Sequence, residues 1–163
     1  MKDLTLIIPA KNESESLPNV LSELGKFDVD IKVILHKEDI LTINSIKNFN
    51  CEIIYQFNKG YGDALIQGIL ETNTKYFCIF NADGSFNPNE LDGMLNKLKM
   101  LDLDFNFGSR YQKDAGSEDD TVLTLVGNYI FTTIGKLFFK LPISDILYTF
   151  VIGKTDSAKK INL

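Results

Sequence analysis

Short apolar runs alternate with amphipathic segments along this chain, and this alternation is the feature that most constrains its fold. Residues 4–8, 31–35, 51–55, 76–80 and 104–107 are rich in β-forming side chains. The segments between them place apolar residues at helical spacing. A strand followed by a helix and another strand favours parallel pairing. The sequence therefore predicts an α/β fold with three layers, in which helices cover both faces of a mostly parallel, Rossmann-like sheet.

The pattern changes beyond residue 107. Residues 112–121 are polar, have no periodicity and predict a loop that can cover a site. Residues 122–141 carry apolar side chains at helical spacing and predict a peripheral apolar helix. Residues 146–152 predict a last strand, and residues 154–163 predict a short polar tail. We expect one domain over residues 1–163.

The composition excludes several classes of protein. A net charge of -5 gives no basic surface for nucleic acid. No run of about 18 uncharged apolar residues occurs, and the chain enters a strand at once, so neither a spanning helix nor a signal peptide is expected. Cys51 and Cys78 lie in separate apolar runs and predict reduced core residues. These features predict a cytoplasmic protein.

Two polar loops follow predicted strands. Asn81 and Asp83 come directly after a run that predicts a buried strand, where ligands bind in open α/β sheets. Their oxygens suit Mg²⁺ or Mn²⁺ on a phosphate, but an Asx turn leading into the next helix explains the same residues equally well. Gly60 and Gly62 stand at the mouth of a predicted helix, where backbone N–H groups can meet an anion or simply form a turn.

The apolar helix predicted over 122–141 has two interpretations. Lys136 and Lys140 lie beside a phenylalanine-rich face, an arrangement that suits the surface of a membrane. The alternative is a helix packed on the domain itself or on a second copy in a homodimer.

Five motifs in this order resemble the inverting family 2 glycosyltransferases with a GT-A fold. This group includes dolichol-phosphate mannose synthase and bacterial polyprenyl-phosphate sugar transferases. The resemblance covers roughly residues 4–154, and its motifs are residues 7–13, 58–64 with Gly68 and Ile69, 81–85, 108–111, and Asp145 with Phe150.

The resemblance implies a nucleotide-sugar site. Residues around the nucleobase and ribose would be Pro9, Ala10, Asn12 and Glu13, with Lys59 and Asp63 at the border of the pocket. The remaining nucleotide-sugar-binding positions are Asp39, Asn81, Ala82, Asp83 and Arg110.

The resemblance also implies catalytic roles. Asp83, with Asn81 as a weaker ligand, would hold Mg²⁺ or Mn²⁺, and Asp145 would be the general base. Arg110 would face the donor phosphates or a phosphate on the acceptor. Plain structural explanations exist as well: a helix N-terminal charge for Glu13, a solvated turn for Lys59, a surface ion pair for Arg110 and a turn cap for Asp145.

The chain departs from the family pattern in three places. Residues 36–39 are His-Lys-Glu-Asp where the family commonly has Asp-Asp-Gly-Ser, and Asn81 stands for an aspartate. Residues 147–151 lack the arginine of Thr-Ser-Gly-Phe-Arg. The chain also ends soon afterwards, which predicts a truncated form or a short form that pairs with another subunit.

These observations lead to two hypotheses. The first is a metal-assisted, inverting transferase that moves a sugar from a UDP- or GDP-linked donor to a polyprenyl phosphate or a glycan. It would be cytoplasmic and peripheral at the inner face of the membrane. The alternative is a catalytically degenerate GT-A domain that serves as a nucleotide-sugar-binding or partner-subunit module.

Overall fold

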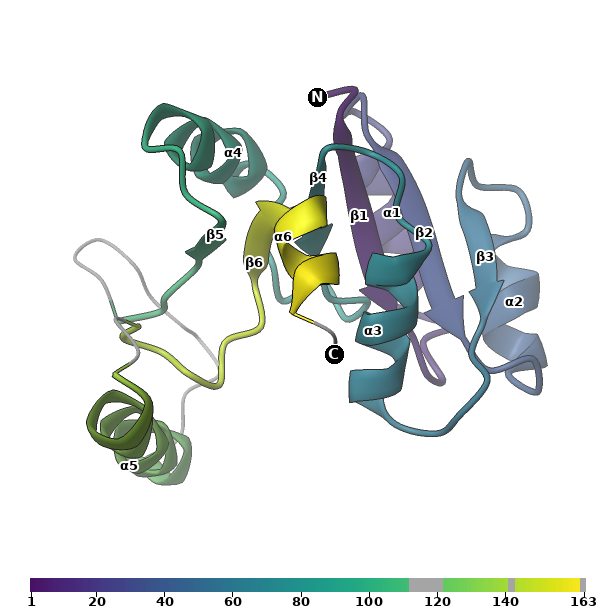
Figure 1. Ribbon diagram of the computed structural model, residues 1–163. Helices are drawn as coiled ribbons and strands as arrows, with labels where there is room; N and C mark the ends of the chain where they lie inside the picture. Colours follow the sequence, from purple (N-terminus) through teal and green to yellow (C-terminus); the bar gives the residue numbers. More distant parts are fainter. Residues whose placement is uncertain (112–121, 141–142, 162–163) are drawn as a thin grey trace. The chain divides into compact units, whose positions relative to one another are not determined.

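The computed structural model describes residues 1–111, 122–140 and 143–161. The chain separates into two compact units (Figure 1). Unit 1 comprises Met1–Asn106 and Val151–Leu163, and unit 2 comprises Phe107–Phe150. The predicted loop over 112–121 and the last residue of the helix predicted over 122–141 lie outside the described residues.

A six-stranded sheet forms the centre of unit 1. Its strands in chain order are β1 (Leu4–Pro9), β2 (Asp30–Leu35), β3 (Glu52–Tyr55), β4 (Tyr76–Ile79), β5 (Phe105–Phe107) and β6 (Val151–Lys154). The order across the sheet is β3-β2-β1-β4-β6-β5. The pairs β1–β2, β1–β4 and β2–β3 are parallel, and β6 runs antiparallel to β4. The predicted α/β fold with a mostly parallel sheet is confirmed.

Helices cover both faces of this sheet. They are α1 (Leu17–Leu24), α2 (Ile40–Ile46), α3 (Tyr61–Leu70), α4 (Glu90–Met100) and α6 (Thr155–Lys160). The chain moves outward from β1 to β3 through α1 and α2, and then returns across the sheet to β4 through α3. Because such crossovers are right-handed, this reversal places α3 on the face opposite α1 and α2. Figure 1 shows α3 and α6 together in front of the strands.

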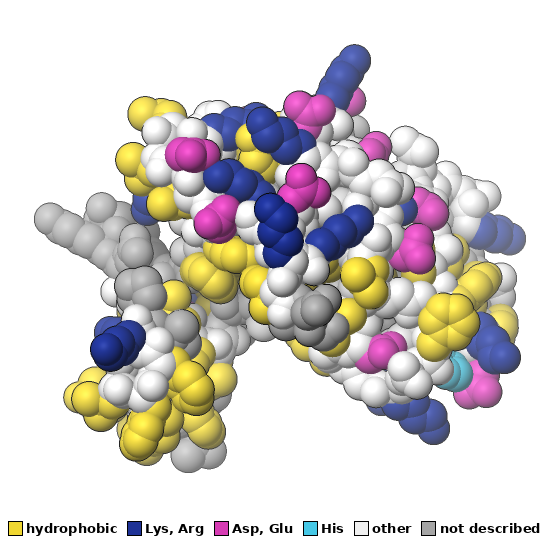
Figure 2. Space-filling model, in the orientation of Figure 1, with side chains coloured by type: hydrophobic (Ala, Val, Ile, Leu, Met, Phe, Trp, Pro, Cys, Tyr) yellow, Lys and Arg dark blue, Asp and Glu magenta, His cyan; other side chains and the backbone are white. Residues whose placement is uncertain are grey.

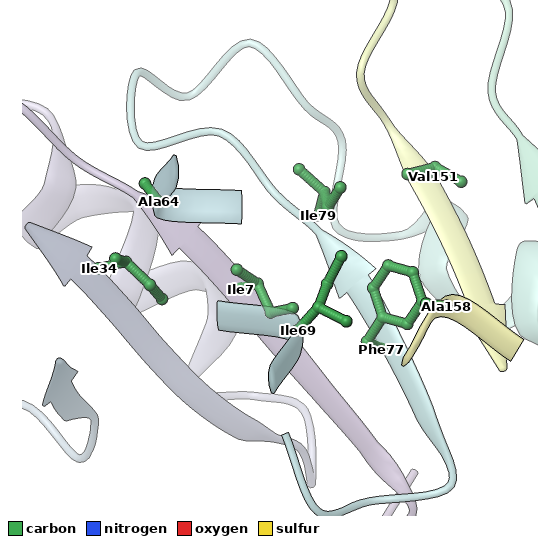
Figure 3. Packing of buried hydrophobic residues seen from close by; sticks show 8 residues of the cluster. All are labelled: Ile7, Ile34, Ala64, Ile69, Phe77, Ile79, Val151 and Ala158. Atoms are coloured by element: carbon green, nitrogen blue, oxygen red, sulfur yellow. The ribbon is translucent and has the colours of Figure 1, made fainter. Parts of the chain in front are cut away.

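Close packing of α3 on the sheet defines one half of the core. Ile7 and Ile34 meet Ala64 and Ile69 of α3, and Phe77 extends the cluster toward α6 (Figure 3). A Cβ added at Gly68 would collide with the side chains of these two strand residues. The glycine therefore lets the helix backbone approach the sheet.

The end of the chain differs from the sequence prediction in one strand and contains one helix that was not predicted. The last strand was predicted over 146–152, but β6 begins only at Val151. Within the short polar tail predicted over 154–163, Thr155–Lys160 form α6. This short helix is stabilised by tertiary contacts, because Ala158 is buried in the core and the Lys159 ammonium donates to the carbonyl of Thr72 (2.7 Å). The sequence pattern for this helix is weak, because a helix of only about one and a half turns is not stable by itself.

Unit 2 contains one long helix and two irregular segments among its described residues. The helix, α5, spans Val122–Phe139 and confirms the helix predicted over 122–141. The irregular segments are residues 108–111 and 143–150. Among the helices of the described ranges, none is both long and apolar enough to cross a membrane.

Candidate functional site

Four loops of unit 1 share one edge of the sheet. They follow β1, β2, β3 and β4, and parallel strands bring their carboxyl ends to the same side. The predicted nucleotide-sugar residues of unit 1 lie in these loops, at the last residue of β1 (Pro9) or at the start of α3. Arg110, predicted to bind the nucleotide sugar, and Asp145, predicted to be the general base, belong to the irregular segments of unit 2.

Asp39 joins the first two loops. One oxygen of its carboxylate accepts the backbone N–H of Asn12 (2.7 Å), and the other accepts the N–H of Thr42 at the start of α2 (3.3 Å). Asn12 has a positive φ of 59°, a conformation that asparagine tolerates better than most residues. Just before it, the N–H of Ala10 donates to the carbonyl of Ile34. The loop that carries the predicted base-binding residues is thus fixed against the end of β2.

These hydrogen bonds also set the protonation of Asp39. Partial burial alone would raise the pKa of its carboxyl group. The bonds from the Asn12 and Thr42 N–H groups and from the Thr42 hydroxyl favour the charged form and outweigh burial, so the pKa lies below its usual value. Asp39 therefore presents a carboxylate at this edge at neutral pH.

Thr42 is a residue of this site that the sequence interpretation missed. Its hydroxyl is fully buried and accepts the N–H of Glu13 (3.0 Å). The carboxylate of Glu13 in turn accepts the hydroxyl of Ser16 (2.5 Å), the residue before α1. The spacing of Asp39 and Thr42 is that of a helix cap, and this could have drawn attention to both.

The glycine-containing loop after β3 is closed by side chains. Asp63 accepts from the Asn58 side chain (2.9 Å), and this bond holds the pKa of Asp63 below its usual value. The Gln56 amide donates to the carbonyl of Gly60 (2.6 Å), whose φ of 118° suits glycine. Lys59 is exposed at the tip of this loop.

The loop after β4 is an Asx turn. The Asp83 carboxylate accepts the N–H of Ser85 (2.9 Å), and the Asn81 amide donates to the hydroxyl of Ser85 (3.0 Å). Ala82 is buried between them, and Gly84 has a positive φ of 83°. The sequence allowed either a metal site or an Asx turn at Asn81 and Asp83, and the Asx turn is formed. The turn leaves two side-chain oxygens available as ligands. Within the described ranges, Oδ2 of Asp83 and Oδ1 of Asn81 make no hydrogen bond.

These two oxygens decide how a metal could be held. Mg²⁺ in phosphate-binding sites is usually held by one or two carboxylates, with the substrate phosphates and water completing the shell. Asp83 with Asn81 fits that donor set. A closed cage of protein ligands does not fit, because the residues that the structure describes include no cluster of three or more His, Cys, Asp or Glu side chains.

A buried ion pair forms the centre of unit 2. The Arg110 guanidinium binds both oxygens of Asp145, with Nε–Oδ2 at 2.9 Å and Nη2–Oδ1 at 3.1 Å. The Arg110 backbone N–H adds a third bond to the same carboxylate (3.3 Å). The side chain of Asp145 has no exposed surface, and that of Arg110 is 21% exposed. The predicted surface ion pair of Arg110 is therefore a buried, bidentate pair.

The surroundings of this pair hold it in place. The guanidinium carbon lies 5.2 Å from the ring centre of Tyr148 and 5.4 Å from that of Tyr111, distances at which a cation is attracted to an aromatic face. The hydroxyls of Ser109 and Ser144 are 2.8 Å apart. These contacts bring together two residues that the sequence placed 35 positions apart, and the tyrosines were not foreseen.

A separate hollow of about 360 Å³ lies at the opposite edge of the sheet, at the starts of the strands. It is bordered by the ion pair between Lys32 and Glu52 and by the hydroxyls of Thr5 and Thr74, which are 2.7 Å apart. Four of its polar side chains are thus bonded to one another in two pairs. The candidate site is therefore assigned to the carboxyl edge.

Comparison with known proteins connects this geometry to a family. The family model for glycosyl transferase family 2 matches residues 5–161. Uncharacterized glycosyltransferases from Mycobacterium bovis and Mycobacterium tuberculosis are 27% identical over 95 residues. The aligned region covers 58% of this chain and 43% of each relative. The chain thus matches less than half the length of these curated relatives.

Solved structures agree at the level of the fold. Mannosyl-3-phosphoglycerate synthase from Rubrobacter xylanophilus superposes with a TM-score of 0.71 at 15% identity, over 94% of this chain and 53% of that one. Glucosyl-3-phosphoglycerate synthase from Mycobacterium tuberculosis, solved with Mn²⁺, UDP-glucose and phosphoglyceric acid, gives 0.69 at 16% identity, over 94% and 56%. With a family model that spans nearly all of its residues, the chain belongs to glycosyl transferase family 2.

Proposed function

We propose that this chain transfers a sugar from a nucleotide-diphosphate sugar, with inversion at the anomeric carbon, to a lipid-linked phosphate. Family membership supports the reaction class. The observation that supports binding of the sugar donor concerns Asp39. Its carboxylate accepts hydrogen bonds from the loop after β1 and from the start of α2. That bond preforms the edge at which Pro9, Ala10 and Asn12 would meet the nucleoside.

The donor diphosphate is assigned to the loop after β4. Asp83 and Asn81 would hold Mg²⁺ or Mn²⁺ there, and structural neighbours solved with Mn²⁺ and UDP support this choice. The chemistry supplied by such a cation, when bound, is neutralisation of the charge that develops on the departing nucleoside diphosphate. The N–H groups at the entry to α3, beside Lys59, favour the same anion.

The Arg110–Asp145 pair supports a phosphate acceptor rather than a glycan hydroxyl. A buried carboxylate with both oxygens on a guanidinium is a poor general base, since protonating it would break the pair. A phosphate monoester has its second pKa near 6 and is largely ionised at pH 7, so its attacking oxygen needs no base. We therefore assign Arg110 to binding the acceptor phosphate and Asp145 to fixing Arg110, in place of the base role predicted for Asp145.

The polarity of α5 supports a lipid on that phosphate. Most of its exposed side chains from Val126 to Phe139 are apolar, and Phe138 is 77% exposed. Apolar side chains gather over α5 in Figure 2. The exposed set is Val126, Tyr129, Ile130, Phe131, Ile134, Leu137, Phe138 and Phe139. Lys136 and Lys140 provide positive charge beside this surface, as suits anionic lipid headgroups. We propose that α5 lies on the membrane that carries the acceptor.

The test compares acceptors. Nucleotide release is followed with UDP-glucose, UDP-galactose or GDP-mannose and Mn²⁺, in the presence of a detergent-dispersed polyprenyl phosphate or of a soluble oligosaccharide. We expect release with one of the donors, and only with the polyprenyl phosphate. Release with the oligosaccharide alone would contradict the lipid acceptor.

One observation favours a second function. Asn81 supplies a neutral amide where the family resemblance implies a carboxylate, which weakens the metal site. A chain that binds nucleotide sugar in a Mn²⁺-dependent way but releases no nucleotide with any acceptor would be a binding or partner-subunit module. Calorimetric titration of the same donors distinguishes this outcome from an inactive, non-binding chain.

A further inference from the structure

Helix α5 has inverted polarity. Its exposed side chains from Val126 on are mostly apolar, whereas its buried side chains include two polar ones, Asn128 at 2% exposure and Thr132 at 6%. These residues are four positions apart, so they lie one turn apart on the same side of the helix. A polar side chain buried beneath an apolar exposed face requires a partner, because an unbonded polar group is costly to bury.

The partners are two successive backbone N–H groups in the segment after the helix. The side-chain oxygen of Asn128 accepts the N–H of Leu147 (3.3 Å), and the hydroxyl of Thr132 accepts the N–H of Ile146 (3.2 Å). These N–H groups belong to the run that was predicted as a strand. They are bonded by side chains of α5 instead of by a neighbouring strand.

Both bonded N–H groups come directly after Asp145. The carboxylate of Asp145 is buried and makes a two-point contact with Arg110, which requires its backbone to be held at a fixed distance from residues 108–111. We propose that Asn128 and Thr132 are positioning residues, which hold Asp145 and through it set the direction of the Arg110 guanidinium. This inference rests on the proposed function, in which Arg110 binds the acceptor phosphate.

In this proposal, the exposed and buried sides of α5 have different functions. Its exposed side meets the lipid, and its buried side orients the pair that meets the phosphate of that lipid. Membrane contact and the geometry of the phosphate site are therefore connected through one helix. A displacement of about 1 Å at a substrate-binding group can reduce the rate of an enzyme by about 100-fold, so small changes at these two residues are expected to be measurable.

The experiment uses paired substitutions in the full chain. Thr132→Val removes the hydroxyl and keeps the shape, and Asn128→Leu removes the other acceptor. Thr133→Val is the matched control, because the Thr133 hydroxyl donates to the Tyr129 carbonyl of its own helix (2.7 Å). Thr132→Ser keeps the acceptor and should restore wild-type behaviour.

The first readout is kinetic. We expect Thr132→Val and Asn128→Leu to raise the KM for polyprenyl phosphate by about tenfold or more while the KM for the donor stays within twofold, since a displaced Arg110 affects only the acceptor. Thr133→Val and Thr132→Ser should match the wild type. An unchanged acceptor KM in the two test variants would overturn the proposal.

The second readout does not need turnover, so it separates this inference from the proposed function. The Nε–H of Arg110 donates to a buried carboxylate and should exchange slowly with solvent in a ¹⁵N NMR spectrum. We expect its exchange to accelerate about tenfold or more in Thr132→Val, while amide protons of β1 and of α5 keep their protection. If wild type and Thr132→Val exchange alike, the positioning role is wrong, whatever the chain transfers. If the protons behave as expected but no acceptor is glycosylated, the positioning stands and the proposed function fails.

Discussion

At the residue scale, two glycines in helices have opposite surroundings. A Cβ at Gly68 of α3 would collide with the Ile7 and Ile34 side chains, whereas a Cβ at Gly93 of α4 would meet no atom within 4 Å. We expect Gly68→Ala to lower the free energy of unfolding by about 1–3 kcal/mol, because the core must shift. Gly93→Ala should raise it by about 0.5–1 kcal/mol, since alanine loses less entropy in a helix. Urea denaturation measures both, and a neutral Gly68→Ala would contradict the close packing.

Asp39 makes a prediction about pH. Its folded pKa lies below the unfolded value, so its contribution to stability is complete above the unfolded pKa and is lost as the pH falls through the folded pKa. We expect Asp39→Asn to cost about 1 kcal/mol at pH 7, because a hydrogen bond to a charged group is stronger than one to a neutral group. The difference from wild type should vanish at acid pH below the folded pKa. If the difference in stability between Asp39→Asn and wild type grows on acidification, the pKa of Asp39 is not lowered by folding.

The sequence located polar site residues better than it described their bonds. Asp39 was placed in the site although its loop departs from the family pattern, and its bond to Asn12 could not be seen because it spans 27 positions. Arg110 and Asp145 were both selected, but their mutual bond depends on how two irregular segments meet. Such pairings are set by tertiary structure, about which local residue patterns carry no information.

At the scale of elements, the pattern of alternating strands and helices was sufficient for the main sheet. The strands predicted over 4–8, 31–35 and 76–80 correspond to β1, β2 and β4, because each is a buried run bounded by polar residues. The strand predicted over 146–152 failed for a physical reason. The N–H groups of Ile146 and Leu147 are bonded by side chains of α5, and only the residues from Val151 on find a strand partner in β4.

The exposed surface of α5 makes a prediction of its own. Replacing Leu137 and Phe138 by glutamine together should reduce binding to vesicles of phosphatidylcholine with phosphatidylglycerol at least tenfold, because each buried apolar side chain contributes about 1.5–3 kcal/mol. Met100→Gln is the control, since Met100 is an exposed apolar residue of α4. Co-sedimentation measures the binding. A dimer-to-monomer shift in analytical ultracentrifugation, without any effect on vesicle binding, would instead identify a second copy as the partner of α5.

At the scale of the whole molecule, the chain leaves unit 1 after Asn106 and returns to it at Val151. The residues assigned to the donor belong to unit 1, and the Arg110–Asp145 pair assigned to the acceptor belongs to unit 2. Substitutions in the two units should therefore affect the two substrates separately. In unit 1 the expected effect is on nucleotide sugar, and in unit 2 it is on polyprenyl phosphate.

The most direct test of the central claim is Mn²⁺-dependent nucleotide release from UDP- and GDP-sugars in the presence of polyprenyl phosphate, measured for the wild type, Asp83→Ala and Asp92→Ala. Asp92 is the matched control, an exposed aspartate in the first turn of α4. We predict that Asp83→Ala loses about 100-fold or more of the wild-type rate, because its carboxylate is the one charged ligand assigned to the metal. Asp92→Ala should retain the wild-type rate. A wild-type rate in Asp83→Ala would contradict the assignment of the loop after β4 as the donor site.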